Sequence, residues 1–169
     1  TQTYTGGLNT ASVGGVVTLK GTLNTTNTAM TFGAITLGDN TTLNTNATTT
    51  AGDLTLGAVT LAGYTLTLQT GTGANTSAAD VNGTSVSGAG TLALQTIGGT
   101  ASFTGAVSPA TLTVASTVNN AAFTGTASTI TNAVTFSNTG TLTLGASGGA
   151  GTQTYTGGLN TASVGGVVT

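Results

Sequence analysis

The feature that most constrains this chain is an 18-residue segment that occurs twice without a change. TQTYTGGLNTASVGGVVT forms residues 1–18 and returns as residues 152–169, 151 positions later in a chain of 169 residues. An independent folding unit has no reason to begin and end with the same segment. We therefore interpret the chain as one 151-residue period of a tandem array plus the start of the next period. The alternative is an independent fragment with two similar end segments.

A shorter and looser period lies inside the long one. Four pairs of segments align at spacings of 20 to 26 residues: MTFGAITL at 30–37 with LTLGAVTL at 54–61, TLTLQT at 65–70 with TLALQT at 91–96, SFTG at 102–105 with AFTG at 122–125, and GTLNTTN at 21–27 with TTLNTNA at 41–47. Repeats of this length are typical of solenoids, in which one coil buries its apolar face only by stacking on its neighbours.

The local pattern within these repeats predicts strands. Apolar residues alternate with threonine in TLTL at 65–68, TLTV at 111–114 and TLTL at 141–144. Alternation with period 2 places Leu, Val and Ile on one face of a strand and Thr on the other. Gly, Asn and Ser, which separate these runs, favour turns. Strong helix formers are scarce, with no Glu and only one Lys and one Met.

These patterns together predict an all-β fold. We expect a parallel β-solenoid (β-helix) of roughly seven coils per 151-residue repeat, with residues 1–169 as one solenoid segment. Each coil would contribute about three short strands, and a spacing of about 4.8 Å between coils gives roughly 34 Å per long repeat. The aromatic residues are expected to stack on residues of adjacent coils: Phe32, Phe103, Phe123, Phe136, Tyr4 and Tyr64.

The residue types that are missing exclude most functional classes. The chain has one Lys, no Arg, three Asp, no Glu, no His and no Cys, and its net charge is −2. Without His or Cys it lacks the common activated nucleophiles and zinc ligands, and it forms no disulfide. A single cation does not neutralise a phosphate backbone, so nucleic acid is not an expected partner. We therefore expect no enzyme and no catalytic, cofactor-binding or metal site.

The sequence predicts neither a membrane-spanning segment nor a signal peptide. No apolar run approaches the roughly 20 residues that span a bilayer, so we expect no membrane insertion. No charged region followed by an apolar stretch marks a signal peptide, and the chain starts at Thr1. The sequence is therefore expected to be a mature or excised piece of a longer protein.

The few charged residues are interpreted as turn residues. Asp39, Asp53 and Asp80 would bind Ca²⁺ only if stacking brought them together, because this ion takes six to eight oxygen ligands. They lie 14 and 27 residues apart and lack dense Gly-Asp loops, so solvated turns are the favoured interpretation. Lys20 is a candidate partner for Asp39 on a neighbouring coil, in a pair worth about 0 to 1 kcal/mol when exposed.

Threonine triplets raise the hypothesis of ice binding. Solenoid faces with outward Thr-x-Thr are similar to those of ice-binding proteins, and the chain has this form at residues 1–5, 65–67, 111–113, 129–131 and 141–143. With 45 threonines in the chain, many triplets arise by chance. Their spacings also differ, which does not favour one aligned face. Five N-x-S/T sequons occur at the frequency that composition alone predicts: Asn24, Asn40, Asn46, Asn75 and Asn82.

One stretch carries a family resemblance. Residues 140–166, GTLTLGASGGAGTQTYTGGLNTASVGG, resemble the autotransporter-associated β-strand repeat and, more broadly, haemagglutinin-like β-solenoid surface proteins of bacteria, in which a GTLTL strand precedes a TYTGG element. The resemblance covers about one sixth of the chain, and the Gly-rich connection is longer here. It implies a secreted, cell-surface or filamentous β-solenoid and transfers no activity or site residue.

The sequence therefore predicts a structural protein. Because residues 1–18 and 152–169 are identical, whatever packs below the first also fits above the second, which gives an open linear assembly. We expect the repeat unit of an extracellular or cell-surface filament that elongates by head-to-tail β-stacking, with further copies of itself as partner. Lateral bundling and contact with glycans or a surface are further expectations. The alternatives are the stalk or adhesive passenger of a bacterial adhesin and, less favoured, a Thr-rich ice-binding solenoid.

Overall fold

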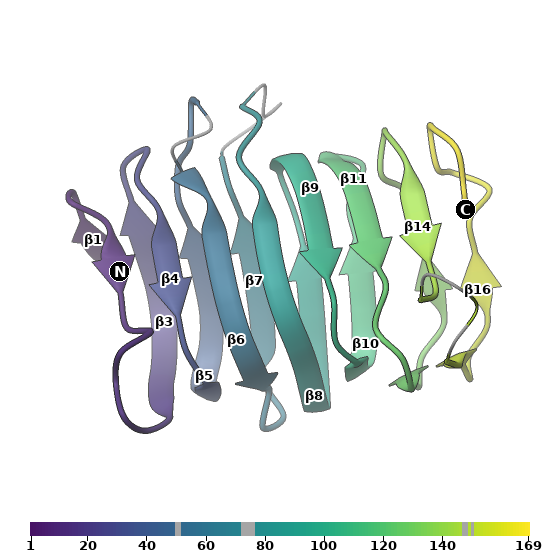
Figure 1. Cartoon of the computed structure of the whole chain (residues 1–169), viewed down its shortest axis with the longest axis horizontal. Helices are drawn as coiled ribbons and strands as arrows, with labels where there is room; N and C mark the ends of the chain where they lie inside the picture. The colour runs from purple at the N-terminus through teal and green to yellow at the C-terminus, as the bar shows by residue number, and fades with distance from the viewer. Residues whose placement is uncertain (50–51, 72–76, 147–148, 150) are drawn as a thin grey trace.

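The chain winds as a stack of parallel β-coils from the N-terminal to the C-terminal end (Figure 1). This arrangement is seen in a computed structural model that describes residues 1–49, 52–71, 77–146, 149 and 151–169. The described elements are all strands: β1 (Gln2–Tyr4), β2 (Leu8–Asn9), β3 (Val17–Thr25), β4 (Met30–Phe32), β5 (Ile35–Asn44), β6 (Leu54–Thr60), β7 (Thr65–Gln69), β8 (Val81–Leu94), β9 (Ile97–Phe103), β10 (Val107–Val114), β11 (Val118–Phe123), β12 (Ser128–Ile130), β13 (Val134–Thr135), β14 (Leu142–Leu144), β15 (Gln153–Tyr155) and β16 (Leu159–Asn160).

The parallel pairings between coils define three sides. Long strands such as β3, β5 and β8 bend and contribute to more than one side. Side I consists of residues 17–19, 35–37, 58–60, 85–87, 107–109, 128–130 and 153–155. Side II consists of residues 2–4, 21–24, 41–44, 65–69, 91–94, 111–114, 134–136 and 159–160. Side III consists of residues 8–9, 30–32, 54–56, 81–83, 101–103, 121–123, 142–144 and 168.

The predicted fold class is confirmed. The chain is a parallel β-solenoid of about seven coils with about three strands in each. The four alignments found within the sequence are also registers of the structure, because each places residues that pair directly on neighbouring coils. The corresponding pairs are Met30 with Leu54, Thr65 with Thr91, Phe103 with Phe123, and Leu23 with Leu43.

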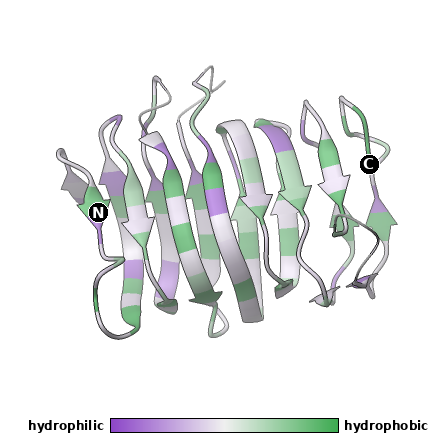
Figure 2. Ribbon diagram, viewed as in Figure 1, coloured by the Kyte–Doolittle hydropathy of each residue, from purple (hydrophilic) through white to green (hydrophobic). Residues whose placement is uncertain are grey.

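The core is a continuous column of apolar side chains inside the coils. Alternation along each strand turns every second residue inward, and the inward residues of successive coils lie above one another. On side II, for example, Leu43, Leu68 and Leu94 are fully buried. Green hydrophobic bands on neighbouring strands follow this arrangement along the stack (Figure 2). Burial of one such side chain contributes about 1.5–3 kcal/mol, so each coil is stabilised mainly by the coils on either side of it.

Aromatic stacking is confirmed for part of the expected set. The rings of Phe103 and Phe123 stack in parallel with centroids 5.6 Å apart, and Phe136 meets Phe123 edge-on at 5.7 Å. Phe136 also meets Tyr155 at 6.5 Å. Gly83 makes room for this row, because a Cβ there would meet the ring of Phe103. By contrast, Tyr64 lies on the surface with 37% of its area exposed.

Buried threonines hold the corner between sides II and III. Thr25, Thr45 and Thr70 occupy equivalent positions in successive coils and are completely buried. The Thr25 hydroxyl donates to the Thr45 carbonyl and the Thr45 hydroxyl donates to the Thr70 carbonyl, each at 3.4 Å. A buried hydroxyl needs such a partner, and here the partner belongs to the next coil. The corner therefore links coils along the axis even where the strands are interrupted.

Candidate assembly site

The two copies of the repeated segment lie at opposite ends of the stack and pair in opposite directions. In the N-terminal copy, β1 pairs with residues 23–25 and β2 pairs with β4, both of which follow it in the chain. In the C-terminal copy, β15 pairs with β12 and β16 pairs with β13, both of which precede it. The N-terminal copy thus pairs through its upper edge, the edge that faces the C-terminal end of the stack. The C-terminal copy pairs through its lower edge, which faces the N-terminal end.

The copies nevertheless share one local conformation. Tyr4 donates its hydroxyl proton to Gln2 Oε1 at 2.6 Å, and Tyr155 does the same to Gln153 at 3.0 Å. The side-chain oxygens of Asn9 and Asn160 each accept the backbone N–H two residues later at 2.9 Å. Gly7 and Gly158, at the first corner, have φ of +88° and +103°, a range that favours glycine. The segment therefore folds alike against two different neighbours.

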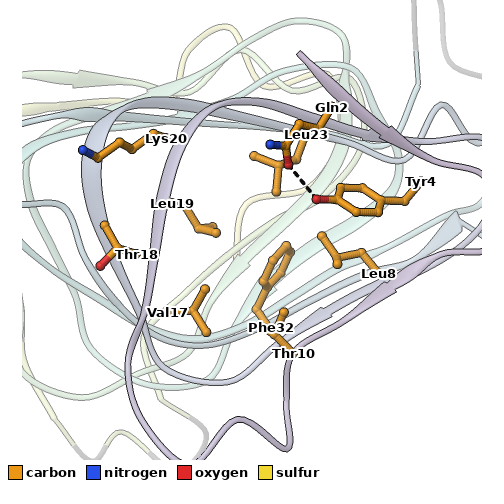
Figure 3. A pocket seen from close by; sticks show the side chains of 10 residues that line it. All are labelled: Gln2, Tyr4, Leu8, Thr10, Val17, Thr18, Leu19, Lys20, Leu23 and Phe32. Atoms are coloured by element: carbon orange, nitrogen blue, oxygen red, sulfur yellow. Dashed lines mark hydrogen bonds between the residues drawn. The ribbon is translucent and has the colours of Figure 1, made fainter.

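At the N-terminal end, the first coil leaves the core open. A cavity of about 350 Å³ lies there, lined by residues of all three sides: Gln2, Tyr4, Leu8, Thr10, Val17, Thr18, Leu19, Lys20, Leu23 and Phe32. In Figure 3, Leu8, Leu19 and Phe32 converge on the interior of the coil. The apolar part of this lining continues the core row of the later coils. The opening is thus the end of the core rather than a pocket in its wall.

At the C-terminal end, inward-facing apolar residues lie uncovered. Leu159 and Val168 are each 44% exposed, whereas the equivalent Leu8 and Val17 are half-buried because β4 and β5 cover them. Val16 and Val167 behave differently, with exposures of 61% and 65% in the two copies. Val167 therefore points outward, while Leu159 and Val168 point inward and lack a coil above them.

Among the residues that the structure describes, the three aspartates do not form one cluster that could hold a metal ion. Asp53 and Asp80 are half-buried at one corner, where Asp53 Oδ1 accepts the N–H of Asp80 at 2.8 Å and Asp80 Oδ1 accepts the N–H of Thr100 at 2.7 Å. These turns are therefore less solvated than the sequence predicted. Asp39 is exposed and accepts the N–H of Asn40. Lys20 extends its aliphatic stem over Gly38 on the neighbouring coil.

The threonine triplets fall on all three sides. Residues 1–5, 65–67 and 111–113 lie on side II, residues 129–131 on side I and residues 141–143 on side III. They do not form one array. Side I carries instead a row of hydroxyl residues, one per coil, that we call the hydroxyl row: Thr18, Thr36, Thr60, Ser87, Ser108, Thr129 and Thr154. The signal in the sequence was the short pattern AIT, AVT, SVS and AVS at residues 34–36, 58–60, 85–87 and 106–108.

Comparison with known proteins adds no relative. The chain matches no family model, no curated protein and no solved structure. The resemblance of residues 140–166 to β-strand-repeat surface proteins therefore stays a prediction. Within the described ranges, no helix is long and apolar enough to cross a membrane, and no three His, Cys, Asp or Glu side chains come together as a metal ion would require.

The pKa of Tyr155, the tyrosine of the C-terminal copy, is raised by burial of its side chain. Burial of the side chain against Phe136 raises the pKa of Tyr155 from 10.0 to about 12, because the phenolate loses hydration. The folded state therefore disfavours the charged form. The contribution of the neutral phenol to stability is complete below pH 10 and is lost as the pH rises through 12.

This shift predicts a late ionisation step. In a titration of the full chain followed by absorbance at 295 nm, we expect a step near pH 12 that is missing in Tyr155→Phe. Circular dichroism at each pH checks that the chain stays folded. If Tyr155→Phe instead removes part of the absorbance change near pH 10, compared with the unmodified chain, the ring of Tyr155 is not packed on the preceding coil.

Proposed function

We propose that this chain is the structural repeat unit of a fibre in which coils stack without interruption from one 151-residue repeat to the next. The observation that carries the proposal is that the edge left open in each copy of the segment is the edge occupied in the other copy. A single segment can therefore be covered on both edges at once. It would lie above residues 128–144 of one repeat and below residues 19–37 of the next.

The contacts at such a junction follow from the two ends. Below the segment, Tyr155 packs on Phe136, and Gln153 Nε2 donates to the carbonyls of Phe123 and Gly125. Above the segment, the residues equivalent to Leu159 and Val168 pair with Met30 and Ile35, both buried. The junction would thus have an apolar centre and a complete set of strand hydrogen bonds, as the interior coils have.

The surface chemistry supports an assembly that tolerates close packing. The chain has a net charge of −2 and only 2% charged residues, so little electrostatic repulsion opposes lateral contact between fibres. Together with the resemblance of residues 140–166 to bacterial surface repeats, this supports an extracellular or cell-surface fibre. We propose no catalytic step and no cofactor.

The proposal predicts that Leu159 changes its role when a second repeat follows. In a tandem of two repeats, Leu159→Ala in the junction should lower the free energy of unfolding by about 2–5 kcal/mol, because it removes a buried side chain. In the single 169-residue chain, where Leu159 is 44% exposed, the loss should be about 1 kcal/mol or less. Urea denaturation of all four proteins gives the comparison.

Val167→Ala is the matched control, because Val167 points outward in either context. It should have the same small effect, about 0.5 kcal/mol, in the tandem and in the single chain. If Leu159→Ala had equal small effects in both proteins, the junction would not be covered and the continuous fibre would be wrong.

The hydroxyl row favours an adhesive passenger as a second candidate. It presents one uncharged hydroxyl per coil along side I, and Thr60 and Thr129 are among its exposed members. Such a row is suited to hydrogen bonding with a glycan or with ordered water. Replacing Thr60 and Thr129 by Val should abolish binding to a glycan array where the row binds a glycan, and thermal hysteresis where it binds the ordered water of ice. The replacement should leave the circular dichroism spectrum unchanged. An unmodified chain inactive in both assays would remove this candidate.

A further inference from the structure

The two copies of the segment occupy different sides of the solenoid. Gln2–Tyr4 lie on side II, whereas the identical Gln153–Tyr155 lie on side I. Leu8 and Asn9 lie on side III, whereas Leu159 and Asn160 lie on side II. Val17 lies on side I and Val168 on side III. All three parts of the segment have therefore moved by one side in the same direction.

The displacement means that one repeat is not a whole number of coils. From Gln2 on side II, six complete coils lead to Val134 on side II, and two further sides lead through Leu142 on side III to Gln153 on side I. The 151 residues thus wind six and two-thirds coils. At about 4.8 Å per coil this is an axial rise of about 32 Å, slightly less than seven whole coils would give.

We propose that each repeat of the fibre is turned by one side relative to the repeat before it. Side II of a following repeat continues side I of the present one, its side III continues side II, and its side I continues side III. Three repeats make 20 coils, or about 96 Å, before the same feature returns to the same side. This inference rests on the proposed function, because it describes how a second copy seats on the first.

The shared conformation of the two copies makes the rotation feasible. The Tyr–Gln hydrogen bond, the Asn turn and the glycine corner form in both positions. Sides I and II therefore accept the same strand, and sides II and III accept the next one. A junction turned by one side requires no change in the chain, because it is the packing that residues 152–169 already adopt.

The rotation limits the hydroxyl row to one repeat at a time. On any one side of the fibre, the hydroxyl row of one repeat is followed by side II of the next, where the half-buried Thr22, Thr42 and Thr67 pair in succession at outward positions. The three sides of the fibre then carry the same rows in the same order, displaced by one repeat. The fibre has no unique flat face, so lateral contacts are equivalent on all three sides.

The rotation can be tested with single thiols, since the chain has no cysteine. In a tandem of two repeats, Thr60→Cys in both repeats places a label at the same exposed side I position of each. After coupling to maleimide-biotin and streptavidin, electron microscopy should show the two labels on different sides of one rod.

The matched control combines Thr60→Cys in the first repeat with Thr113→Cys in the second. Thr113 is exposed on side II, so rotation by one side brings both labels to the same side of the rod. If the repeats stacked by whole coils, the two results would be exchanged, and that outcome would overturn the inference. A tandem that is not one continuous rod about 32 Å longer than the single chain would instead contradict the proposed fibre.

Discussion

Backbone hydrogen bonding along the solenoid axis is the constraint on which the rest of the structure depends. Each coil donates and accepts through its strands to the coil below and the coil above, and its inward side chains have no other apolar surface to pack against. An end coil therefore always leaves one row of peptide groups and one layer of core uncovered. The open cavity beside Phe32 and the exposed Leu159 are the two forms of this deficit. In the proposed fibre, the repeated segment would cover both the open cavity and the exposed Leu159, because it joins one repeat to the next.

Much of the fold was predictable because it follows from period-2 alternation and self-similarity. Alternating Leu and Thr specified which residues face inward, and segments that resemble each other proved to pair directly, as Phe103 does with Phe123. The corners were not predictable. Coils differ by several residues in length, with Leu23 pairing 20 positions ahead and Leu54 pairing 27 ahead, and part of such a difference is a register shift within a strand, as between Leu19 and Gly21. Turn length leaves the alternation unchanged, so the pattern carries no signal for it.

The candidate site was predictable in part for the same reason. Identity of residues 1–18 and 152–169 located the two ends, but it could not show that the copies lie on different sides, because that depends on the summed lengths of all intervening turns. Thr-x-Thr triplets within one strand do not predict the hydroxyl row, because the row joins single residues from the strands of successive coils. The half-buried Asp53 and Asp80 differ from the predicted solvated turns because their carboxylates accept backbone N–H groups of the next coil.

Under the proposed function, the chain would elongate by repeating its own end segment and would need neither a pocket nor charged side chains. Its function would reside in the number of coils and in the sides they present. The most direct measurement is the axial rise per repeat in a long tandem array, obtained by cryo-electron microscopy or fibre diffraction. The account predicts a coil spacing near 4.8 Å throughout and a rise of about 32 Å per repeat. Separate bodies joined by linkers, with no coil spacing across the junctions, would contradict it.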